Sequence, residues 1–73
     1  MADHVLDCTG LSCPMPIVKL SRAVKQLTAG QTLEIEASDA AFEADVRAWS
    51  AKTGNPIISF SDGDSQHVTI QKV

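Results

Sequence analysis

Hydrophobic and polar residues recur along this chain with two different periods, which predict four strands and two helices. Short apolar or alternating runs beside turn-forming residues predict strands at residues 4–8, 32–37, 56–61 and 67–73. Apolar residues at helical spacing predict helices over residues 14–29 and 40–53. The predicted order of elements is therefore βαβαββ.

Each predicted helix carries a single apolar stripe. The first stripe has four members: Ile17, Leu20, Val24 and Leu27. The second has three, which we expect in the core: Phe42, Val46 and Trp49. Because one stripe needs one partner surface, both helices must lie on the same face of a four-stranded sheet. We therefore expect an α/β two-layer sandwich with a mixed sheet, which begins with a right-handed parallel crossover. Its outer face should be polar, in keeping with Glu34 and Glu36.

Turn and cap residues predict where the elements end. Pro14 suits the first position of a helix, where its missing N–H is no loss. Gly30 is expected as the left-handed residue that ends this helix, and Gly54 as the residue that ends the second. Asp39 is expected as the N-cap of the second helix. Residues 62–64, Asp-Gly-Asp, should form the turn between the last two strands.

Length and composition restrict the class of protein. We expect the 73 residues to form one domain, 1–73, and the hydrophobic fraction of 44% argues against disorder. The first residues, MADHVLD, contain neither a basic leader nor an apolar signal segment, so we expect a cytoplasmic protein that does not contact a membrane. A net charge of −3 and an aromatic content of 4% argue against direct nucleic-acid binding.

Charge is distributed unevenly along the chain. No Asp or Glu lies between Cys8 and Leu33, whereas this stretch contains Lys19, Arg22 and Lys25. These three side chains fall on the face of the first helix opposite its apolar stripe. They are either a solvated helix face or a surface that docks an acidic partner. The charge pattern alone favours the solvated face.

Cys13 is the candidate reactive residue. It lies in the segment GLSCPMP, residues 10–16, between a strand and the start of a helix. Unpaired N–H groups and the helix dipole favour an anion at such a position, and a thiolate is the reactive form of cysteine. The prolines of this segment would add rigidity and shape, because they cannot donate a hydrogen bond. A cysteine that only occupies a helix start for structural reasons is an equally good interpretation of this pattern.

The segment LDCTGLSCPMP, residues 6–16, closely resembles the signature of the TusA/SirA-like family of sulfurtransferases. The resemblance continues through residues 30–33, 38–39 and 53–54 and the closing hairpin, and thus covers nearly the whole chain. It implies a sulfur carrier in which Cys13 accepts sulfane sulfur as a persulfide and passes it to partner proteins. Such carriers serve tRNA thiolation, cofactor biosynthesis or dissimilatory sulfur oxidation.

The resemblance also implies roles for other residues. Asp7, Gly10, Pro14 and Pro16 are motif residues that shape the site. The implied partners are a sulfur donor, either a rhodanese-like protein or a cysteine desulfurase, and a sulfur acceptor. No cofactor or metal is implied, and two cysteines with two distant histidines give no zinc spacing. We expect the free carrier to be a monomer.

The remaining candidates have less specific interpretations. Cys8 is expected as a small hydrophobic residue at the end of the first strand. Met15 either packs against the sheet edge or contacts a partner beside the sulfur. His4 and His67 are expected to be ordinary surface residues.

Two other functions compete with sulfur transfer. One is a non-enzymatic regulatory or partner-binding module of the same fold, in which Cys13 is structural. The other is RNA binding, by analogy with the similar βαβαββ layout of a translation initiation factor domain. A shared fold is a weak argument for a shared function, and the basic surface that RNA binding needs is missing.

Overall fold

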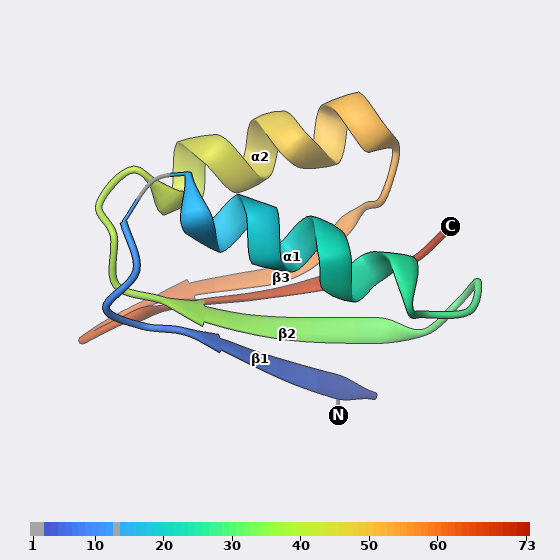
Figure 1. Ribbon diagram of the computed structural model, residues 1–73, viewed down its shortest axis with the longest axis horizontal. Helices are drawn as coiled ribbons and strands as arrows, with labels where there is room; N and C mark the ends of the chain where they lie inside the picture. Colours follow the sequence, from blue (N-terminus) through green and yellow to red (C-terminus); the bar gives the residue numbers. More distant parts are fainter. Residues whose placement is uncertain (1–2, 13) are drawn as a thin grey trace.

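Four strands and two helices alternate in the order βαβαββ in the computed structural model, which describes residues 3–12 and 14–73 (Figure 1). The elements are β1 (His4–Cys8), α1 (Met15–Lys25), β2 (Thr32–Ala37), α2 (Phe42–Thr53), β3 (Ile57–Asp62) and β4 (Gln66–Gln71). The order predicted from the hydrophobic periods is confirmed.

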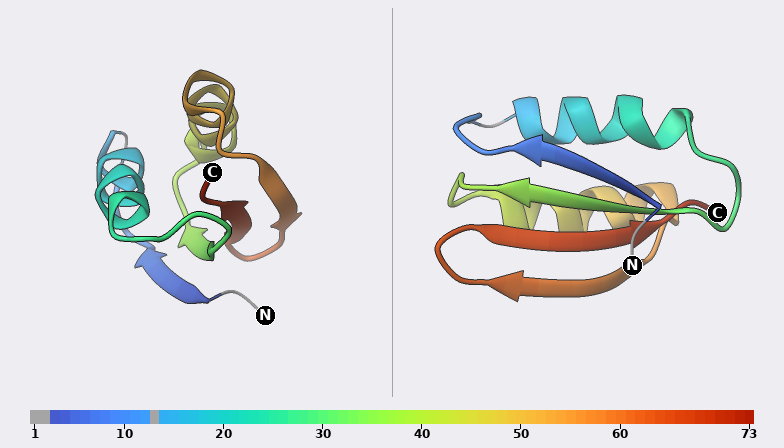
Figure 2. Two further views of the ribbon diagram at one scale, coloured as in Figure 1. Left: turned by 90° about the vertical axis from the view of Figure 1, so that its right-hand side faces the viewer. Right: turned by 90° about the horizontal axis from the view of Figure 1, so that it is seen from below.

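The strands form one sheet in the order β1-β2-β4-β3. β1 and β2 run parallel, whereas β4 is antiparallel to both of its neighbours. Both helices cover the same face of this sheet, with α1 on the β1 side and α2 toward β4 (Figure 2). The structure thus confirms the two-layer α/β sandwich with a mixed sheet and the parallel start.

Alternation along β2 divides the sheet into a buried and an open face. Leu33, Ile35 and Ala37 are buried, whereas Glu34 and Glu36 between them are only half-buried. The other members of the core come from the remaining elements: Cys8, Leu20, Val24, Leu27, Phe42, Val46, Val68 and Ile70. Full burial of one Leu or Ile side chain stabilises the fold by roughly 1.5–3 kcal/mol. The prediction that Trp49 lies in the core is wrong, since this side chain is only partly buried and packs at the margin of the core.

The first helix is shorter than its apolar stripe predicts. α1 ends at Lys25 rather than at residue 29, because Gln26 and Leu27 donate to Ala23 O and Val24 O, which tightens the last turn. Gly30 has the expected positive φ, +91°, but it lies in the loop before β2 and not at the helix end. Its N–H donates to Lys72 O at 2.8 Å, which holds this loop against the end of the chain.

The second helix begins later than expected. Ala41 is its N-cap and Asp39 is not, because a turn in which Phe42 N donates to Asp39 O precedes the first helical residue. The far end is confirmed: Gly54 has φ +80° and donates its N–H to Ser50 O.

The closing hairpin is displaced by about one residue from the prediction. β3 starts at Ile57 because Pro56 has no N–H for the ladder, although its carbonyl accepts from Gln71 N. Asp62 belongs to β3, so the turn consists of residues 63–65 rather than 62–64. β4 begins at Gln66 and ends at Gln71, two residues before the end of the chain.

Candidate functional site

A tight turn after β1 directs the chain toward α1. Leu11 N donates to Cys8 O at 3.2 Å, and Gly10 has φ +80°, as the third residue of a type II turn requires. A residue with a Cβ would be strained at this φ. Gly10 N also donates to Ser38 Oγ at 2.9 Å, which ties the turn to the loop that follows β2. The geometry of this turn therefore depends on Gly10.

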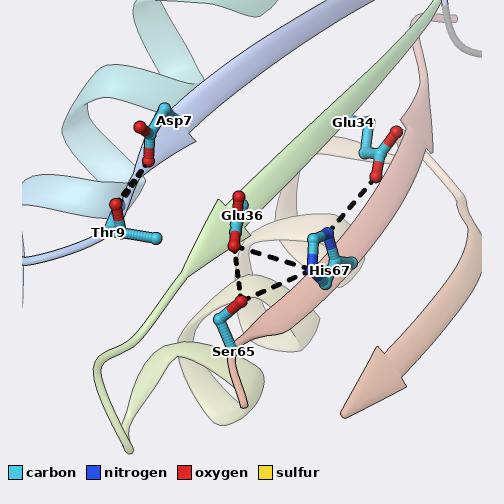
Figure 3. Close-up of polar contacts among 6 residues, drawn as sticks. All are labelled: Asp7, Thr9, Glu34, Glu36, Ser65 and His67. Carbon is cyan, nitrogen blue, oxygen red and sulfur yellow. Dashed lines mark hydrogen bonds and ion pairs between the residues drawn. The ribbon is translucent and has the colours of Figure 1, made fainter. Parts of the chain in front are cut away.

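Asp7 fixes the first half of this turn. Its Oδ1 accepts from the backbone N–H of Thr9 at 2.9 Å and from the Thr9 hydroxyl at 2.6 Å (Figure 3). These bonds, the hydroxyl first, lower the pKa of the Asp7 carboxyl, and the positive charge of Lys19 adds to the effect. Asp7 is therefore a charged structural residue of the turn.

The start of α1 combines two prolines with few free donors. Pro14 is the N-cap and Pro16 the second helical residue. The prediction that Pro14 occupies the first helical position is therefore wrong by one residue, since that position is Met15. Met15 N donates to Ser12 O at 2.9 Å, and Ile17 N donates to Pro14 O at 3.1 Å. Since these first-turn amides have partners, an anion at this end is favoured by the helix dipole rather than by free N–H groups of these residues.

Cys13 itself lies outside the described residues, so its role is argued from its neighbours. Ser12 and Pro14 on either side of it are exposed, whereas Pro16 is fully buried and anchors the first turn in the core. The Met15 side chain is 43% exposed. Met15 is thus not fully packed against the sheet edge, and its contact with a partner stays a prediction.

The structure confirms the interpretation of Cys8 as a core residue. Its side chain is completely buried, and this burial raises the pKa of the thiol, although Lys19 acts in the opposite direction. A buried, protonated thiol is a poor nucleophile. The structure thus disfavours Cys8 as a sulfur acceptor.

The three cations of α1 lie on an exposed face, as predicted. Lys19, Arg22 and Lys25 are each exposed, and the first turn of α1 has no carboxylate. By contrast, α2 carries Glu43 and Asp45 in its first turn. Acidic residues usually favour a helix N-terminus, so their absence from α1 leaves that end available for another anion.

A groove between the helices opens beside Pro14. It has a volume of about 360 Å³, and its lining residues are Pro14, Ile17, Asp45, Ala48, Trp49 and Lys52. The indole N–H of Trp49 donates to Ser21 Oγ at 3.0 Å, which joins the helices behind the groove. Sequence reasoning missed this groove, although the spacing of residues 45, 48, 49 and 52 on one helix face was a usable signal.

The open sheet face holds a polar cluster that the sequence did not reveal. His67 lies between Glu34, at 3.3 Å from Nδ1, and Glu36, at 3.7 Å from Nε2 (Figure 3). Ser65 Oγ donates to Glu36 Oε2 at 2.5 Å. His67 is therefore more constrained than the ordinary surface residue expected from the sequence. Among residues 3–12 and 14–73, no three His, Cys, Asp or Glu side chains are placed to hold a metal ion.

Neither helix in the described part of the chain has the length and apolar character needed to cross a bilayer.

The family comparison is decisive about the class of protein. The sequence profile described as "Sulfurtransferase TusA" matches residues 4–72. This match includes the turn at Gly10, Pro14 and Pro16 and the buried faces of all six elements. The chain belongs to the TusA family, as the motif at residues 6–16 indicated.

Individual relatives agree with this assignment. The chain is 43% identical to YrkI of Bacillus subtilis, which is named a candidate sulfur carrier, over 97% of this chain and 96% of the relative. It is 34% identical to the sulfur carrier protein TusA of Allochromatium vinosum, over 96% and 93% of the two chains. YrkF of B. subtilis is 53% identical over 74% of this chain, but the match spans only 29% of that longer protein.

A solved structure shows the same fold. The SirA-like protein of Desulfitobacterium hafniense superposes with a TM-score of 0.80 over 93% of this chain and 95% of the other, at 20% identity. The family membership supports a sulfur-carrier role and implies protein partners that give and take sulfur.

Proposed function

We propose that this protein is a cytoplasmic sulfurtransferase that carries sulfane sulfur as a persulfide on Cys13. The whole chain, residues 1–73, acts as one carrier domain without a cofactor. A reducing compartment suits it, because the thiol of the empty carrier must stay reduced to accept sulfur.

The proposed transfer step needs no external oxidant or reductant. The Cys13 thiolate attacks the outer sulfur of a donor persulfide, and a new S–S bond forms at Cys13. The S–S bond of the donor breaks, and its electron pair leaves with the donor cysteine as a thiolate. Delivery is the reverse reaction with an acceptor thiolate. Such an exchange needs an accessible, ionised sulfur and no general base.

One contrast between the two cysteines carries this proposal. Cys8 is fully buried with a raised pKa, whereas the residues that flank Cys13 are exposed at the start of α1. The N-terminal end of this helix has no carboxylate in its first turn, and its dipole favours a negative charge. A persulfide is a stronger acid than a thiol, so the same end favours the loaded form.

The exposed surface around the motif is suited to partner contact. Met15 offers a soft apolar side chain beside the sulfur, and Lys19, Arg22 and Lys25 extend along the exposed face of α1. We propose that these residues dock the donor, a rhodanese-like protein or cysteine desulfurase, and the acceptor. The three positive charges would attract acidic surfaces of these partners and steer them toward α1.

The proposal is tested by following sulfur through one cycle with intact-mass spectrometry. Incubation with thiosulfate and a rhodanese, or with cysteine and a desulfurase, should add one sulfur atom to the protein. A subsequent incubation with an acceptor thiol should remove it. Cys13→Ser should prevent both changes, whereas Cys8→Ser, the matched control, should retain them. A non-enzymatic regulatory module would show no added sulfur with either donor.

A further inference from the structure

The two edges of the sheet are protected to different degrees. β3 has an irregular register between Ile57 and Ser59, and such a bulge disrupts pairing with another strand. β1 is regular over all five of its paired residues, His4–Cys8, and contains no proline or lysine. β1 lies at the edge of the sheet (Figure 2), and within the described chain it pairs with β2 alone. Its outer edge therefore presents backbone N–H and C=O groups without a partner strand.

An apolar groove accompanies this open edge. It lies between β1 and α1, has a volume of about 240 Å³, and its lining residues are His4, Val5, Leu6, Ala23, Gln26, Leu27 and Leu33. Val5, the register partner of Glu34 on the open face of the sheet, is 72% exposed, more than Met15, Ile58 or Val73. A strand added to β1 would place every second side chain over this groove.

Positive charge marks one end of the groove. Lys19 lies near enough to Asp7 and Cys8, at the end of β1, to lower the pKa of each. Lys19 and Ala23 are spaced i, i+4, so they lie on one side of α1, and Ala23 lines the groove together with Gln26, the C-cap of this helix. A carboxylate on the added strand would therefore meet Lys19 beside the turn that leads to Cys13.

A second copy of this chain fits the edge poorly. Antiparallel pairing of two β1 strands that sets Val5 opposite Val5 also sets Asp3 opposite Asp7 of the second copy at both ends. The next register sets Val5 opposite Asp7 of the second copy. Like charges or an apolar–charged pair directly opposite each other disfavour both registers.

We propose that β1 docks an extended segment of the sulfur-transfer partner, which adds to the sheet as a fifth strand. The segment has apolar residues at alternate positions facing the β1–α1 groove and a carboxylate at the end nearest Lys19. The inference rests on the proposed function for the identity of the partner, since only four residues separate the end of β1 from Cys13.

Strand addition is tested with a peptide of the required pattern, Glu-Thr-Val-Thr-Val-Thr-Val, and its reversed sequence for the opposite strand direction. NMR titration of the isotope-labelled full-length chain should shift the amide signals of β1 and of the residues that line the β1–α1 groove. Two N-methylated versions of the peptide, one modified at the three valines and one at the three threonines, should differ sharply in their affinity for the chain. One version should lose binding, because only alternate amides face β1.

Two further changes test the strand edge and the charge. Val5→Lys should weaken peptide binding by about tenfold, since a lysine on an edge strand opposes pairing. Ile58→Lys on β3 is the matched control, because Ile58 is also exposed, at 55%, and should leave binding unchanged. Replacement of the peptide glutamate by lysine should weaken binding about fivefold through repulsion from Lys19.

Several results would overturn the inference. These are equal binding of both N-methylated peptides, shifts centred on β3 or on the groove beside Pro14, and no shift up to about 1 mM peptide, the weak end of specific binding. Concentration-dependent dimerisation that protects β1 amides would instead assign the edge to a second copy. Sulfur loading of Cys13 is measured separately by mass. If loading fails while the peptide binds β1, the proposed function is wrong and the edge site stands.

Discussion

At the scale of single residues, the two cysteines differ in what surrounds them. Cys8 is held between the sheet and α1 with no exposed surface, whereas the neighbours of Cys13 are open to solvent. Burial raises the pKa of Cys8 above its ordinary value of 9.0. Position in the fold, rather than residue type, therefore separates the buried thiol of Cys8 from the proposed carrier thiol of Cys13.

This difference predicts opposite alkylation behaviour in the two single-cysteine variants. In Cys13→Ser the remaining Cys8 should react slowly with iodoacetamide even at pH 9.0, its ordinary pKa, and rapidly once urea unfolds the chain. In Cys8→Ser the remaining Cys13 should react in the folded protein with a pH midpoint below this ordinary value. Rates against pH with and without urea provide the measurement. Fast reaction of Cys8 in the folded state would contradict the burial of this thiol.

The same pKa shift has a consequence for stability. Because the pKa of Cys8 is higher in the folded than in the unfolded chain, ionisation favours the unfolded chain. The contribution of Cys8 to stability is thus complete below pH 9.0 and is lost as the pH rises through its folded pKa. The urea midpoint of Cys13→Ser should fall more steeply above pH 9.0 than that of Cys8→Ala/Cys13→Ser. Parallel curves for the two variants would contradict a raised pKa.

At the scale of elements, glycines with positive φ determine where the chain turns. Gly10, Gly30 and Gly54 each have φ between 80° and 91°. Gly10 lies between β1 and α1, Gly30 lies in the loop before β2, and Gly54 directly follows α2. A Cβ at Gly54, as at the other two glycines, would meet no heavy atom within 4 Å. Its conformation therefore depends on the backbone alone.

Gly54→Ala should destabilise the protein by about 1–2 kcal/mol, the cost of a left-handed conformation for an L-residue. The matched control is Gly63→Ala, because Gly63 also has open space around it but is not among the positive-φ glycines. Urea unfolding at equilibrium measures both. Equal effects of the two substitutions would show that the left-handed conformation at Gly54 is not the cause.

Element type and order could be predicted from the sequence, whereas several boundaries could not. Periodicity is a property of many residues, so the six elements followed from it directly. The end of α1 depends on i to i−3 bonds at Gln26 and Leu27, and the start of α2 on a turn at Asp39, which are local choices that propensity does not settle. The complete groove beside Pro14 requires the packing of α1 against α2, and the His67 cluster requires the pairing of β2 with β4, because each joins side chains from different elements.

At the scale of the whole molecule, charge is divided between faces. α1 presents Lys19, Arg22 and Lys25, whereas the open face of the sheet presents Glu34 and Glu36 around His67. A protein that must meet a donor and an acceptor in turn benefits from charge steering, which acts mainly on the association rate. The net charge of −3 conceals this division.

Reversal of two helix charges, Arg22→Glu with Lys25→Glu, should slow sulfur exchange with a rhodanese while folding and chemical persulfidation of Cys13 remain intact. The rate should also become less sensitive to added salt, because the steering term is lost. Lys72→Glu, just beyond the end of β4, is the control for a reversal of the same sign. Stopped-flow transfer rates at several salt concentrations give the measurement. Unchanged rates would show that this face of α1 is an ordinary solvated surface and does not dock a partner.

The central claim is that sulfur resides on Cys13, and its most direct test is localisation of the added sulfur atom. After loading with thiosulfate and a rhodanese, the persulfide is trapped with iodoacetamide, and the chain is cleaved with trypsin. Residues 1–19 remain in one peptide that holds both cysteines, because Lys19 is the first basic cleavage site. Tandem mass spectrometry should place the extra sulfur in fragments that contain Cys13 and exclude Cys8. Extra sulfur on Cys8, or none on this peptide, would contradict the account.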